Sequence, residues 1–186
     1  MVSFGALWLP IVLSAVAVFI VSSVVHMVLK YHASDYVRLP DEDAIRAAIR
    51  AAKPEPRQYM FPHCDSMQEL QTPEMKQKFI DGPVGILTLR PSGEWSMGPS
   101  LAQWFVFSLV ISALVAYAVA HALPAGTPYL AVFRVVGTVA WLGYAGASVP
   151  ASIWMGRPWS VTAKEVFDGL LYGLVTAGMF GWLWPQ

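Results

Sequence analysis

The fold is decided by residues 7–29, which read LWLPIVLSAVAVFIVSSVVHMVL and contain no Lys, Arg, Asp or Glu. A helix of roughly 20 mainly apolar residues crosses a bilayer core of about 30 Å. The stretch is therefore long enough to span a membrane. It lacks the basic start, the short apolar run and the cleavage site of a signal peptide, so we expect it to remain in the mature protein.

Three further stretches have the same apolar character, at residues 101–122, 128–154 and 163–183. The chain is 56% hydrophobic and 13% charged, whereas soluble domains carry about 25% charged residues. We therefore expect an all-α membrane protein with four transmembrane helices in an antiparallel bundle. Tight turns at 122–127 and 155–162 join the last three helices.

Charged residues gather between the first two of these helices. Residues 30–100 hold 9 of the 12 Lys and Arg and 10 of the 12 Asp and Glu. The sequence thus predicts three parts: a first transmembrane helix at 1–30, a polar cap at 31–100 and a three-helix transmembrane unit at 101–186.

The cap carries local signals for both helices and strands. Pro40 and the three acids after it favour a helix that ends before Pro54. Thr72 as N-cap and Pro73 in the first position predict a second helix that ends at Ile80. Apolar runs at 58–61 and 84–89 are typical of short strands. We therefore expect a small α+β polar cap.

Basic residues indicate on which side of the membrane the cap lies. Lys30 and Arg38 follow the first helix, while Arg157 and Lys164 flank the turn between the last two. Lys and Arg are retained on the cytoplasmic side. We therefore expect residues 31–100 in the cytoplasm and both termini outside.

Several short motifs are distributed along the chain. They are Leu7-Trp8-Leu9-Pro10, Pro62-His63-Cys64, Gly82-Pro83-Val84-Gly85, Arg90-Pro91-Ser92-Gly93 and residues 152–160, SIWMGRPWS. Together they resemble a group of bacterial four-helix membrane proteins of unassigned function, and the resemblance covers nearly the whole chain. It implies the bacterial inner (cytoplasmic) membrane and brings no activity, cofactor or site residue with it.

Two stripes of small residues indicate how the helices pack. Small residues every four positions let helix backbones approach closely in lipid. The stripes can close the bundle on itself, or one of them can face a partner chain. Their members are Gly169, Gly173, Ala177 and Gly181 on the last helix, and Ser108, Ser112, Ala116 and Ala120 on the second.

Two ionisable residues, Arg134 and Asp168, fall inside predicted transmembrane helices, where such groups suggest a functional site. Their helices run in opposite directions, so roughly 10–20 Å along the membrane normal separates them and excludes a direct ion pair. Arg134 can extend to the outer headgroups and Asp168 can meet Lys164 one turn earlier. The sharper interpretation is a transport pathway that both residues line.

A metal site is the remaining candidate chemistry. His26 and His32 bracket the end of the first helix, and His63 and Cys64 are adjacent in the cap. Imidazole with thiolate suits copper or zinc, although a surface His and a half-buried Cys explain the same residues. No haem is expected, because a haem held by two histidines needs them at one depth on facing helices, whereas His26 lies at the cytoplasmic end of the first helix and His121 at the outer end of the second.

Other classes of function lack support in the sequence. The 12 basic and 12 acidic residues cancel, so no nucleic acid is expected as a partner. The single cysteine excludes an internal disulfide. A Gly-rich phosphate loop, a Gly-x-Ser-x-Gly elbow and a His-Glu-x-x-His pair are all absent from the sequence. No enzyme is therefore predicted.

The main hypothesis is a non-enzymatic accessory or assembly-type subunit of the inner membrane. Its partners would be the lipid bilayer, other membrane proteins or further copies of itself. The alternatives are copper or zinc binding at the cytoplasmic mouth of helix one, and a small oligomeric transporter.

Overall fold

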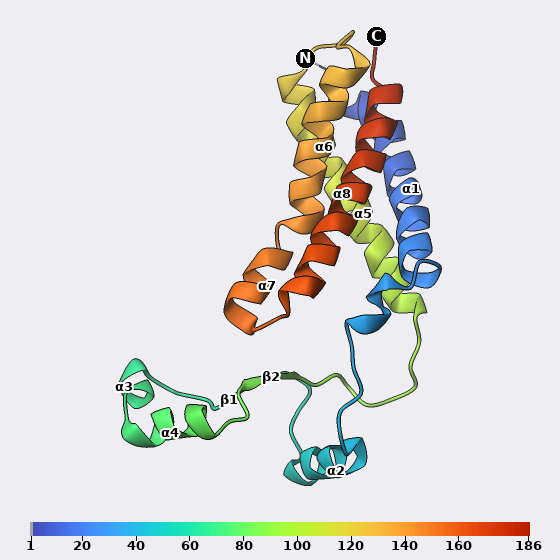
Figure 1. Ribbon diagram of the computed structural model, residues 1–186. Coiled ribbons are helices and arrows are strands. Elements are labelled where there is room, and N and C mark those ends of the chain that lie inside the picture. Colours follow the sequence, from blue (N-terminus) through green and yellow to red (C-terminus); the bar gives the residue numbers. More distant parts are fainter. Residues whose placement is uncertain (1) are drawn as a thin grey trace. The chain divides into compact units, whose positions relative to one another are not determined.

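The computed structural model describes residues 2–186 and is mostly helical (Figure 1). It consists of two compact units. Residues 2–36 and Ser96–Gln186 form the helical unit, and Val37–Trp95 form the polar unit. Residues 31–36 and 96–100, assigned to the polar cap from the sequence, therefore belong with the helices.

Three helical stretches are long and apolar enough to cross a membrane: Phe4–Met27, Gly98–Ala122 and Tyr129–Met155. The first joins the short 3-10 turn η1 (Phe4–Leu7) to α1 (Trp8–Met27), and the second is α5 (Gly98–Ala122). Three of the four expected spans are thus confirmed as candidate spans. The fourth long helix, α8 (Trp159–Trp182), carries Lys164, Glu165 and Asp168 in its first three turns.

The third span is not one continuous helix, contrary to the expectation of a single helix over 128–154. It consists of α6 (Tyr129–Ala145) and α7 (Ser148–Met155), and Figure 1 shows α7 turning away from the line of α6. Pro150 explains the break, because proline has no N–H to donate to the carbonyl four residues earlier, at Gly146. Gly156, with φ 68°, then ends α7.

Glycines bring α6 and α8 into close contact. A Cβ atom on Gly169 would lie 2.7 Å from the Cβ of Ala145, and one on Gly173 would lie 3.1 Å from the carbonyl of Gly137. Gly181 faces the ring of Tyr129, where an added Cβ would lie 2.7 Å from the nearest carbon. The small-residue stripe of the last helix is therefore buried against α6 in this chain.

The second stripe, on α5, is also buried within the helical unit. α5 packs on α1 and on α6, and α8 packs on α1 and on α6. All four members of the stripe are buried: Ser108, Ser112, Ala116 and Ala120. Both stripes are therefore used for packing inside the helical unit.

An apolar core fills the end of the helical unit at which both termini lie (Figure 1). Leu7, Val132 and Phe180 are fully buried there. The indole N–H of Trp184 donates to the carbonyl of Pro124 at 3.0 Å. Gly126 donates its N–H to the carbonyl of Pro185 at 2.9 Å, which fixes the C-terminal residues on the turn between α5 and α6.

The polar unit contains the small α+β arrangement expected from the sequence. Its elements are α2 (Glu42–Ala52), β1 (Gln58–Phe61), α3 (Met67–Leu70), α4 (Pro73–Asp81) and β2 (Gly85–Thr88). The two strands pair antiparallel, with Tyr59 opposite Leu87. The Thr72 hydroxyl caps α4 by accepting from the N–H of Met75 at 3.2 Å, as predicted. Met75 is the one buried side chain in residues 37–95.

Candidate metal centre

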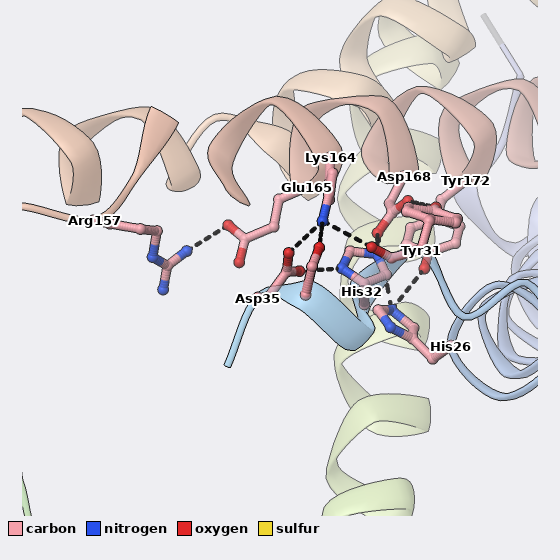
Figure 2. Close-up of polar contacts among 10 residues, drawn as sticks. His26, Tyr31, His32, Asp35, Arg157, Lys164, Glu165, Asp168 and Tyr172 are labelled. Carbon is pink, nitrogen blue, oxygen red and sulfur yellow. Dashed lines mark hydrogen bonds and ion pairs between the residues drawn. The ribbon is translucent and has the colours of Figure 1, made fainter. Parts of the chain in front are cut away.

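A reversal of the chain after α1 creates the polar centre of the helical unit. Lys30 adopts φ 53°, a left-handed conformation that is uncommon for residues other than glycine. The short 3-10 turn η2 (Tyr31–Ser34) then folds back towards α8 (Figure 2). Tyr31 and His32 thereby reach Asp168, which lies more than 130 residues further along the chain.

Three metal-ligating side chains meet at this point: His26 from α1, His32 from η2 and Asp168 from α8 (Figure 2). The Nε2 atom of His32 lies 2.8 Å from Oδ2 of Asp168, and the Nε2 atom of His26 lies 3.9 Å from the same oxygen. All three ligand atoms lie within 4.8 Å of one another. Asp168 is buried, whereas the His26 side chain is 51% exposed, so the centre opens on one side.

Neighbouring side chains contact all three residues of the cluster and orient His32 and Asp168. Nδ1 of His32 lies 2.6 Å from Oδ2 of Asp35. The hydroxyl of Tyr31 donates to Oδ1 of Asp168, which leaves Oδ2 directed at the two histidines. The Tyr172 hydroxyl lies 3.4 Å from Nε2 of His26 (Figure 2). The ring of His32 and the carboxylate of Asp168 are therefore held in defined orientations by these neighbours.

Lys164 of α8 holds η2 and Asp35 in place. Its ammonium group donates to Oδ1 of Asp35 at 2.5 Å, to the hydroxyl of Ser34 at 2.8 Å and to the carbonyl of Tyr31 at 2.7 Å. The sequence suggested that Lys164 would meet Asp168. It pairs with Asp35 instead, because η2 places that carboxylate beside the ammonium.

The pKa shifts of Asp35 and Tyr31 are consistent with these hydrogen bonds. The hydrogen bond from Lys164, and after it the one from His32, lowers the pKa of Asp35, so this carboxyl is ionised at neutral pH. Burial raises the pKa of the Tyr31 phenol, and its hydrogen bond to Asp168 adds to that effect. Tyr31 therefore remains a protonated donor to Asp168.

His32 has a carboxylate at each ring nitrogen, Asp35 at Nδ1 and Asp168 at Nε2. A neutral imidazole carries one N–H, so it can donate to one carboxylate only. The second contact needs either one additional proton, on the imidazole or on Asp168, or a metal ion in its place. This centre is thus suited to bind a cation between His32 and Asp168.

The metal set expected from the sequence is divided between the two units. His26 and His32 come together, but His63 and Cys64 lie in the polar unit. The Nδ1 atom of His63 lies 3.6 Å from Oδ1 of Asp65, with both side chains mostly exposed, and Cys64 is a free, partly buried thiol. The residue that joins the two histidines is Asp168, which the sequence analysis treated as a separate intramembrane group.

Arg134 does not belong to this centre. It is exposed on α6, and the described residues 2–186 include no acidic side chain in an ion pair with it. It does not pair with Asp168, in agreement with the opposite directions of the two helices.

Comparison of the chain with protein families, with curated proteins and with solved structures gives no match.

Proposed function

We propose that this integral membrane protein binds one divalent transition-metal ion, of which Zn²⁺ is the representative, through His26, His32 and Asp168. The observation that carries the proposal is the convergence of three ligand atoms, from three separate segments, within 4.8 Å. A tetrahedral zinc ion with bonds of about 2.0–2.1 Å separates its ligand atoms by roughly 3.3 Å. The distances of 2.8 and 3.9 Å from Asp168 lie on either side of this value.

The neighbours of the three ligands support a metal rather than a simple hydrogen-bond cluster. A metal-ligating histidine almost always donates its second ring N–H to a carboxylate or a carbonyl, which fixes the ring. Asp35 holds His32 in this way, and Lys164 in turn holds Asp35. Tyr31 has the matching role for Asp168. When Nε2 of His32 binds the ion, Asp35 therefore accepts from the N–H at Nδ1 of His32, and Asp168 supplies a ligand oxygen.

The chemistry of the donors favours zinc or a similar divalent ion over copper(I). Two imidazole nitrogens and one carboxylate oxygen form the set, and no thiolate from the described residues 2–186 joins the group. Thiolates and thioethers are the ligands that select copper(I). Three protein ligands also leave one position of a tetrahedral zinc ion free for water or another molecule. We propose a binding role for this centre rather than catalysis.

We further propose that α8 is a fourth span, so that α1, α5, α6 and α8 form an antiparallel bundle. A helix of 24 residues is about 36 Å long. Its charged residues are all at one end, where Glu165 pairs with Arg157 and Lys164 pairs with Asp35. The remaining residues, 169–182, are mainly apolar or small. The metal centre would then lie at the membrane boundary.

The basic residues near this boundary support a cytoplasmic position for the centre, with both termini outside. Lys30, Arg157 and Lys164 all lie at this end of the helical unit. The resemblance to bacterial four-helix proteins supports the inner membrane as the location.

The test is zinc binding by the full chain, purified in a mild detergent and stripped of metal with a chelator. Equilibrium dialysis, read out by elemental analysis, should give one zinc ion per chain. His26→Gln and His32→Gln should each lower the affinity at least about ten-fold, because each removes a ligand. His63→Gln and His121→Gln are the matched controls, since neither side chain belongs to the centre.

A second readout separates loss of binding from loss of folding. Zinc should raise the thermal unfolding temperature of the wild type and of the His63→Gln control, because it binds the folded state. His32→Gln should unfold in one transition that zinc does not shift. Zinc bound equally well by wild type and His32→Gln, or no bound zinc in any variant, would refute the metal proposal and leave a cluster held by hydrogen bonds alone.

A further inference from the structure

A groove runs along the surface of the helical unit between α6 and α8, and its lining residues are separate from those of the metal centre. Its volume is about 220 Å³. Arg134 lies at one end and Trp141 and Leu170 at the other; Gly137, Thr138 and Leu174 are among the residues between them.

The groove exists because small residues bring the two helices together beneath it. Gly137 has no side chain to fill the space, and a Cβ there would already touch Ala177 at 3.4 Å. The large side chains of Trp141 and Leu174 rise at its edges and are partly exposed. The indole N–H of Trp141 donates to the carbonyl of Val166 at 3.1 Å, which fixes that edge.

The guanidinium of Arg134 is the one charged group among the residues that line this groove. The nearby hydroxyl of Thr138 is already engaged, because it donates to the backbone carbonyl of Arg134 at 2.9 Å. No acidic side chain in residues 2–186 forms an ion pair with Arg134. An arginine without a counter-charge inside an apolar span is unfavourable, so an anion from outside the chain would stabilise Arg134.

The position of Arg134 along α6 shows where that anion would lie. The helix begins at Tyr129, so Arg134 lies about 7.5 Å from its end, and Trp141 lies about 10 Å deeper. The guanidinium can extend to the headgroup level along its own apolar stem. The groove therefore has its charged end towards the membrane surface and its apolar end towards the bilayer centre.

We propose that this groove binds one anionic phospholipid, with the phosphate on Arg134 and an acyl chain between α6 and α8. A phospholipid has the same order of charged and apolar parts along the membrane normal. Arginine is suited to the headgroup because its planar guanidinium binds phosphate oxygens in pairs. The ligand class follows from the unpaired charge at one end of an apolar groove.

The experiment is native mass spectrometry of the full chain in a mild detergent, titrated with two lipids that have identical acyl chains. Phosphatidylglycerol is anionic and phosphatidylcholine is zwitterionic. Both lipids carry a phosphate, but the quaternary ammonium of phosphatidylcholine offsets its negative charge. Wild type should therefore bind one phosphatidylglycerol about ten-fold more tightly than phosphatidylcholine, because only the anionic lipid brings a net opposite charge to Arg134. Arg134→Gln should abolish this preference, and Arg134→Lys should retain part of it because the charge remains.

Two further variants distinguish lipid binding in the groove from non-specific attraction of anionic lipid to positive charge on the protein. Arg90→Gln removes an exposed positive charge in the polar unit and should leave the lipid preference unchanged. Leu174→Trp fills the groove and should weaken binding of both lipids. An undiminished preference for phosphatidylglycerol in Arg134→Gln, or equal losses in Arg134→Gln and Arg90→Gln, would overturn the proposal.

Discussion

At the scale of single residues, the centre depends on how one buried carboxylate and one imidazole share their partners. Asp168 directs one oxygen to Tyr31 and the other to His32. His32 in turn lies between Asp168 and Asp35. Each of these side chains therefore has one partner that orients it and one atom that remains available for a cation.

Asp35 provides the sharpest prediction at this scale, because it touches the proposed ligand His32 without being a ligand itself. Asp35→Asn keeps the shape of the side chain and removes the charge that orients the ring. Loss of such a partner typically lowers metal affinity about 10–100-fold. Isothermal titration with zinc should show this drop with one binding site retained.

The matched control is Asp65→Asn, because Asp65 lies beside His63 in the polar unit much as Asp35 lies beside His32. Its zinc affinity should equal that of the wild type. Equal affinities for Asp35→Asn and wild type would mean that His32 needs no orienting carboxylate and would count against the proposed ligand geometry.

At the scale of elements, α6 and α8 pack closely where a glycine of α8 lies against the backbone or Cβ atoms of α6. An added Cβ at Gly169 would lie 3.1 Å from the backbone N of Ala145, whereas one at Gly178 would meet only the Tyr129 hydroxyl, at 3.9 Å. Both residues are on α8. They therefore form a matched pair in which the same substitution has opposite consequences.

Gly169→Ala should lower the free energy of unfolding by about 1–3 kcal/mol, the usual effect of forcing an extra methyl group into a packed contact. Gly178→Ala should be neutral or raise it by up to about 1 kcal/mol, since alanine favours the helix and the space is open. Thermal or denaturant unfolding in detergent measures both. Similar losses in the two variants would show that glycine is needed along α8 for some reason other than this close contact.

At the scale of the whole molecule, the sequence predicted the helices and strands, which depend on neighbouring residues. It missed the cluster of His26, His32 and Asp168, which depends on residues far apart in the chain. The apolar run at 101–122, the Thr72-Pro73 helix start and the strands near 58–61 and 84–89 are local signals, and each element lies close to its predicted place. Pro150 inside an apolar run was a local signal for the break in the third span, but the hydrophobicity around it favoured one long helix.

The proposed metal centre is the part that local patterns could not give. His32 and Asp168 are 136 residues apart, and they meet only because Lys30 reverses the chain and η2 folds onto α8. The adjacent pair His63 and Cys64 is more conspicuous in the sequence, yet it belongs to a different unit. Proximity in the sequence was therefore a poor guide to which histidines and acids share a site.

Whether α8 crosses the membrane is a question about the whole molecule, and single cysteines can answer it in a Cys64→Ser background. Ala125, in the turn between α5 and α6, and Ser160, in the first turn of α8, are both exposed. We predict that Ala125→Cys and Gln186→Cys react on intact cells with a membrane-impermeant thiol reagent. Ser160→Cys should react only after the cells are permeabilised, because about 33 Å of helix, from Ser160 to Trp182, separates it from the C-terminal residues.

Each pattern of labelling has a distinct meaning. Reaction of Ser160→Cys alone would reverse the orientation but keep α8 as a span, since the two ends of the helix would still lie on opposite sides. Equal reaction of Ser160→Cys and Gln186→Cys would show that α8 does not cross. In that case the position of the centre relative to the membrane would rest on α1 alone, because His26 lies in the last turn of that candidate span.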